Sequence, residues 1–233
     1  MLTLLILQFI AHVLADFTFQ PQQWCEKKDK KLFSKEHLFH IIIVFGFSWL
    51  CSMQIEFWRA ALVIAAIHFL FDLLKSVLSR QQKLASLLFF VDQSLHLMVI
   101  VIATYWFSAV QIIEFPIEIT SHAALVVLSF LLCAKPANII VREILKSFEI
   151  YVSDPADTNQ LMNAGQLIGT LERIISLALI LIDQFAAVGF IIAAKSLLRF
   201  RDTATARTEY LLIGTLLSFG IVILLGIICK FII

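Results

Sequence analysis

The sequence predicts an all-α protein: a polytopic bundle of about eight transmembrane helices with one amphipathic helix on the membrane interface. Three observations predict this fold. Hydrophobic residues make up 61% of the 233 residues, and the mean hydropathy is +0.94. A water-soluble domain of this length cannot bury so much apolar side chain. The apolar residues also fall in runs of about 20, the length that crosses a bilayer as a helix, and charged residues gather between the runs.

Eight apolar runs are the expected transmembrane helices. They cover residues 2–19, 37–53, 59–79, 85–107, 119–135, 162–181, 184–200 and 209–229. The first run lacks the basic region and cleavage site of a signal peptide, so we expect it to remain as a helix. No stretch resembles a soluble domain. We therefore expect residues 1–233 to form a single membrane domain, with a histidine- and aspartate-bearing half over 1–107 and C-terminal helices over 162–229.

The interfacial helix is expected over residues 138–152, NIIVREILKSFEIYV. Hydrophobic side chains such as Val141, Leu145 and Phe148 fall on one helical face, and Arg142 and Lys146 fall on the other. This pattern is typical of a helix that lies on a membrane surface. A helix packed on the rest of the protein has the same pattern, so both interpretations stay open.

The positive charges predict the orientation of the chain. Of the 18 lysines and arginines, fifteen lie in one set of alternate loops, including the loop WCEKKDKKLFSKE after the first run. Basic loops stay in the cytoplasm, so we expect both termini outside. The net charge of +1 excludes a nucleic-acid-binding domain, which would carry a large basic excess.

Histidine and aspartate recur four residues apart within three of the apolar runs. The pairs are His12 and Asp16, His68 and Asp72, and Asp92 and His96. Residues at this spacing lie on one face of a helix, one turn apart. The order reverses in the run 85–107, which crosses in the opposite direction. All three helices are therefore expected to place the carboxylate nearer the cytoplasm and the imidazole one turn deeper.

These pairs are expected to bind a divalent metal ion. An isolated charge at the bilayer centre costs at least about 2.5–3.5 kcal/mol, so the carboxylates should face protein groups or a cation. Imidazole and carboxylate together suit zinc, manganese or iron. The expected ligands are His12, Asp16, His68, Asp72, Asp92 and His96, and Asp16, Asp72 and Asp92 are also candidates for a catalytic base.

Four further residues are expected to orient these ligands from a second layer: His37, His40, Gln20 and Gln93. Two alternatives to the metal site stay open. The pairs could form hydrogen bonds that only hold helices together, or they could conduct protons or cations.

A second set of charged residues lies in the C-terminal half. We expect Arg173, Lys195 and Arg199 to bind an anionic headgroup, because guanidinium and ammonium groups bind phosphate oxygens. The alternative is an ion pair between Glu172 and one of these basic residues, which lowers the cost of a charge in the membrane.

Several motifs together resemble a family of bacterial and phage membrane proteins known as a domain of unknown function. They are AHVLADFTFQ, HFLFDLLK, DQSLH, GQLIGTLER, GFIIAAKSLLRF and EYLLIGTLLSF, spread over nearly the whole chain. This resemblance implies an integral protein of the bacterial inner membrane and no particular chemistry. The histidine and aspartate pattern is more distantly similar to that of membrane-bound metal-dependent hydrolases.

The expected function is that of an intramembrane metal-dependent hydrolase acting on a lipid or lipid-linked substrate from the cytoplasmic leaflet. A metal ion would activate water, and one aspartate would serve as base. A proton or cation transporter is the first alternative, but the outer halves of the first four runs are almost entirely apolar. A non-catalytic scaffold subunit is the second.

Overall fold

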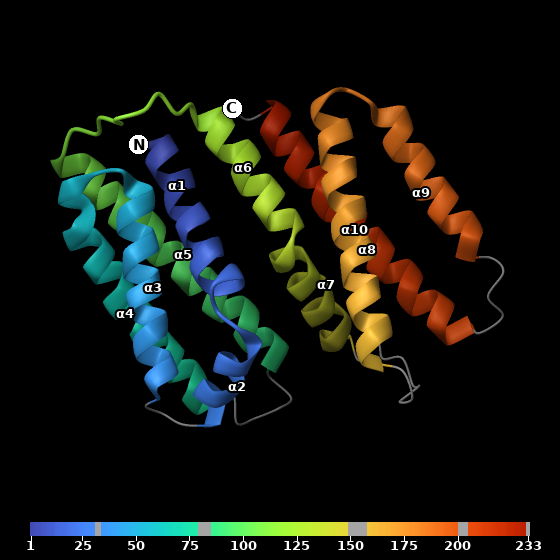
Figure 1. Ribbon diagram of the computed structural model, residues 1–233, viewed down its shortest axis with the longest axis horizontal. Helices are drawn as coiled ribbons and strands as arrows, with labels where there is room; N and C mark the ends of the chain where they lie inside the picture. Colours follow the sequence, from blue (N-terminus) through green and yellow to red (C-terminus); the bar gives the residue numbers. More distant parts are fainter. Residues whose placement is uncertain (31–33, 79–84, 149–157, 200–204, 232–233) are drawn as a thin grey trace. The chain divides into compact units, whose positions relative to one another are not determined.

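The computed structural model describes the chain apart from residues 31–33, 79–84, 149–157, 200–204 and 232–233 (Figure 1). All regular elements within the described ranges are helical, which confirms the all-α class. The chain forms two compact units, Met1–Leu128 and Ser129–Ile233. Whether these units act as the single membrane domain expected from the sequence stays a prediction.

The first unit is built on four long helical segments and one short helix. α1 (Leu2–Val13) continues as a π-helical turn, η1 (Leu14–Thr18), and is followed by α2 (Gln22–Lys30), α3 (Lys35–Ser52), the 3-10 turn η2 (Ile55–Phe57), α4 (Trp58–Leu78) and α5 (Ala85–Val110). α1 packs against α3 and α5, and α4 packs against α3 and α5. The short α2 lies against α3 and α4 at one end of these helices (Figure 1).

Small residues let the helices of the first unit approach closely. Ala60, Ala61 and Ala65 of α4 are almost fully buried in the core, and small side chains at such interfaces are typical of membrane helices. α3 ends at Ser52, where Met53 adopts a left-handed conformation with φ 53°. The Ser52 hydroxyl donates to the carbonyl of Trp49 over 2.6 Å. The chain can therefore turn sharply into η2 and α4.

The second unit contains the end of α6 (Ser121–Cys133), then α7 (Lys135–Ser147), α8 (Thr158–Leu181), α9 (Phe185–Arg199) and α10 (Thr205–Phe231). α10 packs against α7, α8 and α9. The axes of α6 and α7 differ by 50°. Pro136 explains the break, because proline has no backbone N–H and its ring clashes with the preceding helical turn.

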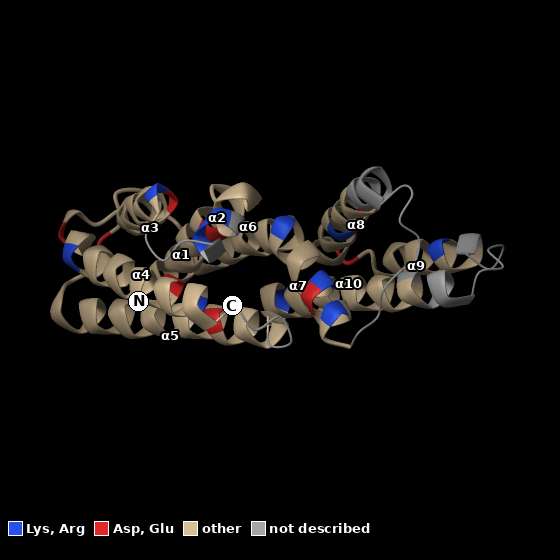
Figure 2. Cartoon of the chain, turned by 90° about the horizontal axis from the view of Figure 1, so that it is seen from below, with Lys and Arg blue, Asp and Glu red and all other residues tan. Residues whose placement is uncertain are grey.

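Fewer membrane spans are supported than the sequence suggests. Among the described residues, Ile55–Leu78, Ala85–Val110 and Leu212–Phe231 are long and apolar enough to cross a membrane, and the bent pair α6 and α7 would add a fourth. Eight spans are not supported. The first apolar segment, Leu2–Thr18, and Phe185–Leu197 are shorter apolar helices. Figure 2 shows helices that are uncharged along most of their length, as expected for segments that face lipid.

α7 forms the amphipathic helix expected near residues 138–152, with Leu145 buried and Lys146 exposed. It packs against α8 and α10 and Leu145 is buried, whereas Phe148, which follows the end of α7, is exposed. Only part of the expected apolar face therefore contacts protein, and a position on the membrane interface stays a prediction. The predicted end of this helix, residues 149–152, lies outside the described residues.

Candidate metal centre

The first unit gathers histidines and aspartates from four helical segments into one buried group, called here the His/Asp cluster. Its members are His12 from α1, Asp16 from η1, His40 from α3, His68 and Asp72 from α4, and Asp92 and His96 from α5. The four histidine side chains of the cluster are at least nine-tenths buried. All six residues expected as ligands are thus brought together, and His40 joins them.

The π-helical turn η1 places Asp16 within the cluster. The amide of Phe19 donates to the carbonyl of Leu14 over 2.8 Å, a bond five residues back along the chain. Such turns are wider than α-helical turns and occur frequently at functional sites. Asp16 therefore faces both His12 of its own helix and the histidines of α3 and α4.

Asp16 Oδ1 lies at nearly equal distances from three imidazole nitrogens. It is 3.7 Å from His12 Nδ1, 3.6 Å from His40 Nε2 and 3.6 Å from His68 Nε2. These separations exceed hydrogen-bond length, and this buried oxygen has no hydrogen-bond partner among the described residues. A buried carboxylate oxygen without a donor is costly, so the arrangement calls for a cation between these atoms.

The hydrogen bond of His12 indicates its tautomer, that is, which ring nitrogen carries the proton and which has a free lone pair. His12 Nε2 lies 3.2 Å from the side-chain oxygen of Gln93, an acceptor, so Nε2 carries the proton. In a neutral imidazole the other nitrogen, Nδ1, is then an acceptor. It points a lone pair at Asp16 Oδ1, which is unfavourable unless a cation lies between them. Gln93, expected as an orienting residue, occupies the position of the usual second partner of a metal-binding histidine.

The other two carboxylates of the cluster each have a lysine partner. Lys28 of α2 is buried and donates to Asp72 Oδ2, and Lys75 of α4 lies 2.7 Å from Asp92 Oδ2. Asp16 contacts no lysine or arginine among the described ion pairs; it contacts histidines only. Within the described part of the chain, Asp16 is therefore the carboxylate of the cluster that no ammonium group compensates.

The spacing of the donor atoms fits a small divalent ion. In a tetrahedral zinc site with metal–nitrogen distances of about 2.0–2.1 Å, the donor atoms lie about 3.3 Å apart. Here the Nε2 atoms of His40 and His68 lie 2.9 Å apart and share a hydrogen bond, whose proton a metal ion would displace, and each is 3.6 Å from Asp16 Oδ1. Shifts of a few tenths of an ångström would bring these three atoms to that spacing. Three nitrogens and one oxygen, with His12 included, favour zinc or iron over the oxygen-preferring magnesium and calcium.

The cluster extends beyond these four residues toward α5. Its possible donor atoms form three overlapping groups, each spanning no more than 4.8 Å: His12, Asp16 and His68; His40, His68 and Asp72; and Asp72, Asp92 and His96. The rings of His68 and His96 lie close, with centroids 3.9 Å apart. Neither nitrogen of His96 has a hydrogen-bond partner within the described residues. A second cation position near Asp72 and His96 is therefore geometrically available.

The remaining orienting residues lie at the edge of the cluster. Gln20 fits best with its side-chain nitrogen 3.2 Å from the carbonyl of Asp16 and its oxygen 2.8 Å from Lys28 Nζ. It links η1 to α2. His37 Nδ1 lies 3.0 Å from Ser34 Oγ, and His37 belongs to none of the three donor groups of the described residues.

Sequence reasoning missed three features of the cluster. It placed His40 in a second layer, although His40 Nε2 lies as close to Asp16 as His68 Nε2 does. It assigned Lys28 and Lys75 only to the basic loops. For Lys75 a signal existed, because it follows Asp72 by three residues and shares its helical face. Nothing in the sequence indicated that α2 would bring Lys28 to Asp72.

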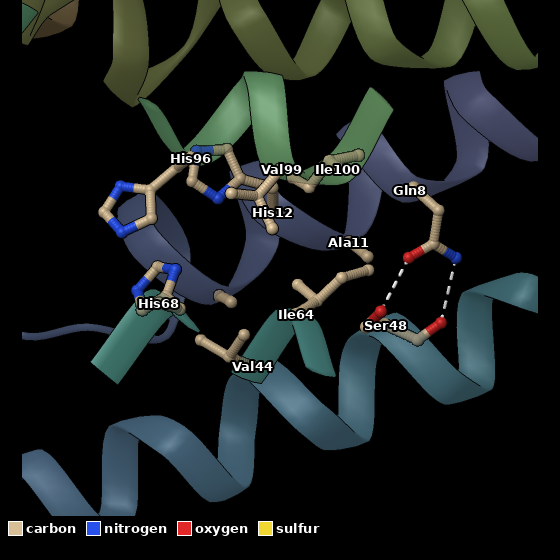
Figure 3. Close-up of a pocket in the computed structure, with 11 residues that line it drawn as sticks. Gln8, Ala11, His12, Val44, Ser48, Ile64, His68, His96, Val99 and Ile100 are labelled. Carbon is tan, nitrogen blue, oxygen red and sulfur yellow. Dashed lines mark hydrogen bonds between the residues drawn. The ribbon is translucent and has the colours of Figure 1, made fainter. Parts of the chain in front are cut away.

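A small cavity adjoins the cluster on the side away from α2. It has a volume of about 10 Å³, close to the minimum for one water molecule. Figure 3 shows His12, His68 and His96 at one end and Gln8 with Ser48 at the other. Gln8 Nε2 donates to the carbonyl of Ser48 over 2.9 Å, and Ser48 Oγ donates to Gln8 Oε1 over 2.6 Å. Buried polar groups thus line both ends of the cavity.

Comparison with known proteins gives one match. A family model described as a protein of unknown function (DUF3307) matches residues 4–122, just over half of the chain. The chain belongs to the DUF3307 family. No curated protein and no solved structure matches it. The DUF3307 region contains every residue of the His/Asp cluster and falls within the first compact unit.

The basic residues expected to bind a headgroup lie outside the DUF3307 region, in the second unit. Lys195 Nζ pairs with Glu172, which is the ion pair that the sequence left open. Arg173 is 2% exposed, and its Nε and Nη1 donate to the carbonyl of Cys133 and the hydroxyl of Ser218, both over 2.7 Å. Its headgroup role is therefore without support in the structure. The side chain of Arg199 lies outside the described residues.

Proposed function

We propose that this protein is an integral membrane hydrolase that uses a divalent metal ion in the His/Asp cluster to cleave a lipid or lipid-linked substrate at the cytoplasmic leaflet. The observation that carries the proposal is Asp16 Oδ1, buried among three imidazole nitrogens at 3.6–3.7 Å without a hydrogen-bond donor in the described part of the chain. A divalent ion satisfies the carboxylate and the facing lone pairs together.

The residues of the cluster have separate roles in this proposal. Asp16, His12, His40 and His68 hold the ion, and Gln93 fixes the ring of His12 through Nε2. A divalent ion held by these residues would lower the pKa of a coordinated water and polarise the bond to be cleaved. Asp92 Oδ1, which is buried without a hydrogen-bond partner among the described residues, accepts a proton from the attacking water. Lys75 holds the other oxygen of Asp92 in place.

Access from the cytoplasmic leaflet is consistent with the position of the cluster. The side chains of Asp72 and Lys75 are 12% and 33% exposed, while His40 is 1% exposed, so the cluster opens on the side of Asp72 and Lys75. α2, which carries Lys28, lies on that side and belongs to the lysine-rich loop. By the positive-inside rule this loop faces the cytoplasm.

Metal analysis of the purified protein tests the proposal. Wild-type protein loaded with zinc in detergent and then desalted is expected to retain about one ion per chain by mass spectrometry of the metal. Asp16→Asn keeps the size of the side chain but removes its charge, and should lower the metal affinity by at least about tenfold.

Glu118→Gln provides the matched control, because Glu118 is an exposed carboxylate in the same unit. It should bind metal like the wild type. A wild-type protein that is folded but retains no metal, or an Asp16→Asn variant with full occupancy, would exclude the metal-dependent mechanism and favour a scaffold role.

Cation or proton transport is the second candidate, and the cavity favours it. Gln8 and Ser48 extend the row of polar groups from His12 and His68 along the interior of the unit, in outer halves of the runs that the sequence shows as almost entirely apolar. Transport is tested by measuring uptake of labelled zinc or protons into proteoliposomes. Uptake that Gln8→Leu abolishes without changing the metal content would favour transport over hydrolysis. Absence of uptake by the wild type would remove this candidate.

A further inference from the structure

The charges of the His/Asp cluster bear on the class of substrate. Among the described residues, three carboxylates, those of Asp16, Asp72 and Asp92, face two ammonium groups, those of Lys28 and Lys75. With neutral imidazoles one negative charge remains, and a bound divalent ion turns it into one positive charge. A net charge in apolar surroundings is unfavourable. A substrate that brings negative charge balances the loaded site, whereas a neutral ester or amide does not.

Lys28 places a positive charge where it could bind a negatively charged substrate. It is 5% exposed, which is rare for a lysine, and α2 packs against α3 and α4. Its ammonium group contacts Asp72 Oδ2, the atom that lies 3.8 Å from His40 Nε2. Lys28 Nζ and the imidazole of His40 therefore flank one carboxylate oxygen, which places a fixed positive charge beside the proposed metal position.

Lys75 supplies a second positive charge on the open side of the cluster. Its Nζ contacts Asp92 Oδ2, and the donor atoms of Asp92, Asp72 and His96 lie within 4.8 Å of one another. Asp72 and Asp92 thus hold the two ammonium groups around the same part of the cluster. Lysine binds phosphate as a compact point charge with three donors.

We propose, building on the hydrolase function above, that the substrate is a phosphate ester whose phosphoryl oxygens are bound by Lys28 and Lys75 together with the metal ion. A phosphate monoester in its singly ionised form carries one negative charge, which balances the loaded site, and it offers three terminal oxygens, one for each of these three cations, whereas a carboxylate offers two. Fixed positive charges also stabilise the charge of a phosphoryl group during transfer.

The reaction is a hydrolysis and needs no further reactant. The oxygen of water bonds to phosphorus and the bond from phosphorus to the ester oxygen breaks. The proton accepted by Asp92 passes to the leaving alcohol, so the products are inorganic phosphate and the alcohol.

Phosphate binding tests the inference separately from metal binding. The full-length protein in detergent is loaded with Mn²⁺, its metal content is measured, and broadening of the ³¹P resonance of inorganic phosphate reports phosphate near the ion. Lys28→Met and Lys75→Met should retain the metal but weaken phosphate binding by about tenfold or more, because each removes a charge-assisted hydrogen bond. Lys28→Arg should retain binding.

Lys27→Met is the matched control. Lys27 is the neighbour of Lys28 on α2, but its side chain is 60% exposed and pairs with Glu36, so its loss should not change phosphate binding. If Lys28→Met does not fold, Lys75→Met carries the test. Full metal content with phosphate binding unchanged in the folded lysine variants overturns the phosphate inference and leaves the hydrolase proposal standing. Loss of metal from the wild type overturns both.

Activity distinguishes a lipid source of the phosphate from a soluble one. Phosphate release is measured from phosphatidic acid in mixed micelles and from glycerol 3-phosphate, which carries the same headgroup without acyl chains. Release from phosphatidic acid alone supports a lipid phosphate ester, and release from both supports a phosphate ester of either source. Cleavage of a neutral lipid ester with no phosphate release from either overturns the inference.

Discussion

At the scale of single residues, the contrast between the three aspartates of the His/Asp cluster is the central feature. Asp72 and Asp92 each contact a lysine, and the described ion pairs of Asp16 are with histidines. The same side chain in the same buried group therefore has two environments. The ammonium partners of Asp72 and Asp92 already neutralise these two carboxylates. Asp16 is surrounded by imidazole nitrogens, which can bind a cation together with its carboxylate.

Substitution of Gln93 tests the proposed metal site without replacing any of its proposed ligands. Gln93→Leu removes the acceptor for His12 Nε2 while keeping a similar volume, so the ring loses its fixed orientation. The metal affinity should fall about 10- to 100-fold, measured by competition with a zinc-binding dye. Ser94 is exposed, and its hydroxyl donates to the carbonyl of Phe90 in the same helix, α5, so Ser94→Ala should bind zinc normally. Equal affinities of the two variants would show that Gln93 does not orient a ligand.

At the scale of helices, Arg173 of α8 stabilises the break that Pro136 introduces between α6 and α7. Its guanidinium donates to the carbonyl of Cys133 at the end of α6 and to the side chain of Asn138 in α7. Carbonyls at a helix end have no partner in the helix. Arg173 thus supplies donors to a buried helix terminus and links both halves of the bent pair.

Arg173→Met should destabilise the second unit. The substitution keeps a long apolar chain but leaves the carbonyl of Cys133 and the hydroxyl of Ser218 without this donor, at about 1–3 kcal/mol for each buried group. A lower midpoint of thermal unfolding in detergent is expected, with metal binding unchanged because the cluster lies in the first unit. Arg142→Met, on the half-exposed surface of α7, should leave the midpoint unchanged; equal midpoints for the two variants would contradict the capping role.

Local helical geometry explains what the sequence could predict. The runs 59–79 and 85–107 correspond closely to α4 (Trp58–Leu78) and α5 (Ala85–Val110), and the spacing of His68 and Asp72 alone placed them on one face. Hydrophobic periodicity and residue spacing are properties of a single helix, so they can be recognised without a structure.

Features that depend on contacts between helices could not be predicted in this way. The contact of His40 with Asp16 depends on how α3 is rotated against η1, and the contact of Lys28 with Asp72 depends on where α2 packs. The number of spans was overestimated because a run such as 37–53 corresponds to a helix that starts with Lys35 and Glu36. With 18 residues α3 is long enough for a span, but this polar start lowers its mean hydropathy. An apolar run therefore does not show that the whole helix around it is apolar enough to cross a membrane.

At the scale of the whole molecule, each of the two compact units contains its own set of buried charged residues. The first unit contains the family region and the complete His/Asp cluster. The second contains the Glu172 and Lys195 ion pair and the donors of Arg173. Within the described residues, the proposed metal ligands and their lysine partners come from the first unit alone.

A fragment of residues 1–134 should therefore bind metal like the full chain. It keeps α1 to α5 and α6 complete, so its zinc content per chain and its loss of zinc on Asp16→Asn should match those of the full-length protein. Metal analysis of the purified fragment, with circular dichroism to confirm helix content, is the measurement. A folded fragment without zinc would mean that the second unit contributes to the site.

The π-helical turn η1 (Leu14–Thr18) bears on how the position of Asp16 in the His/Asp cluster can arise or be lost in evolution. A π-helical turn is an ordinary helix with one surplus residue accommodated as a bulge. Deleting Leu14 would remove this surplus residue, and the backbone would close into a continuous α-helix in which Asp16 follows His12 by three residues instead of four. The carboxylate would then point in a different direction from the helix axis and lose its present distances to His40 and His68. The insertion of one residue into a regular helix is therefore enough to produce the present position of Asp16.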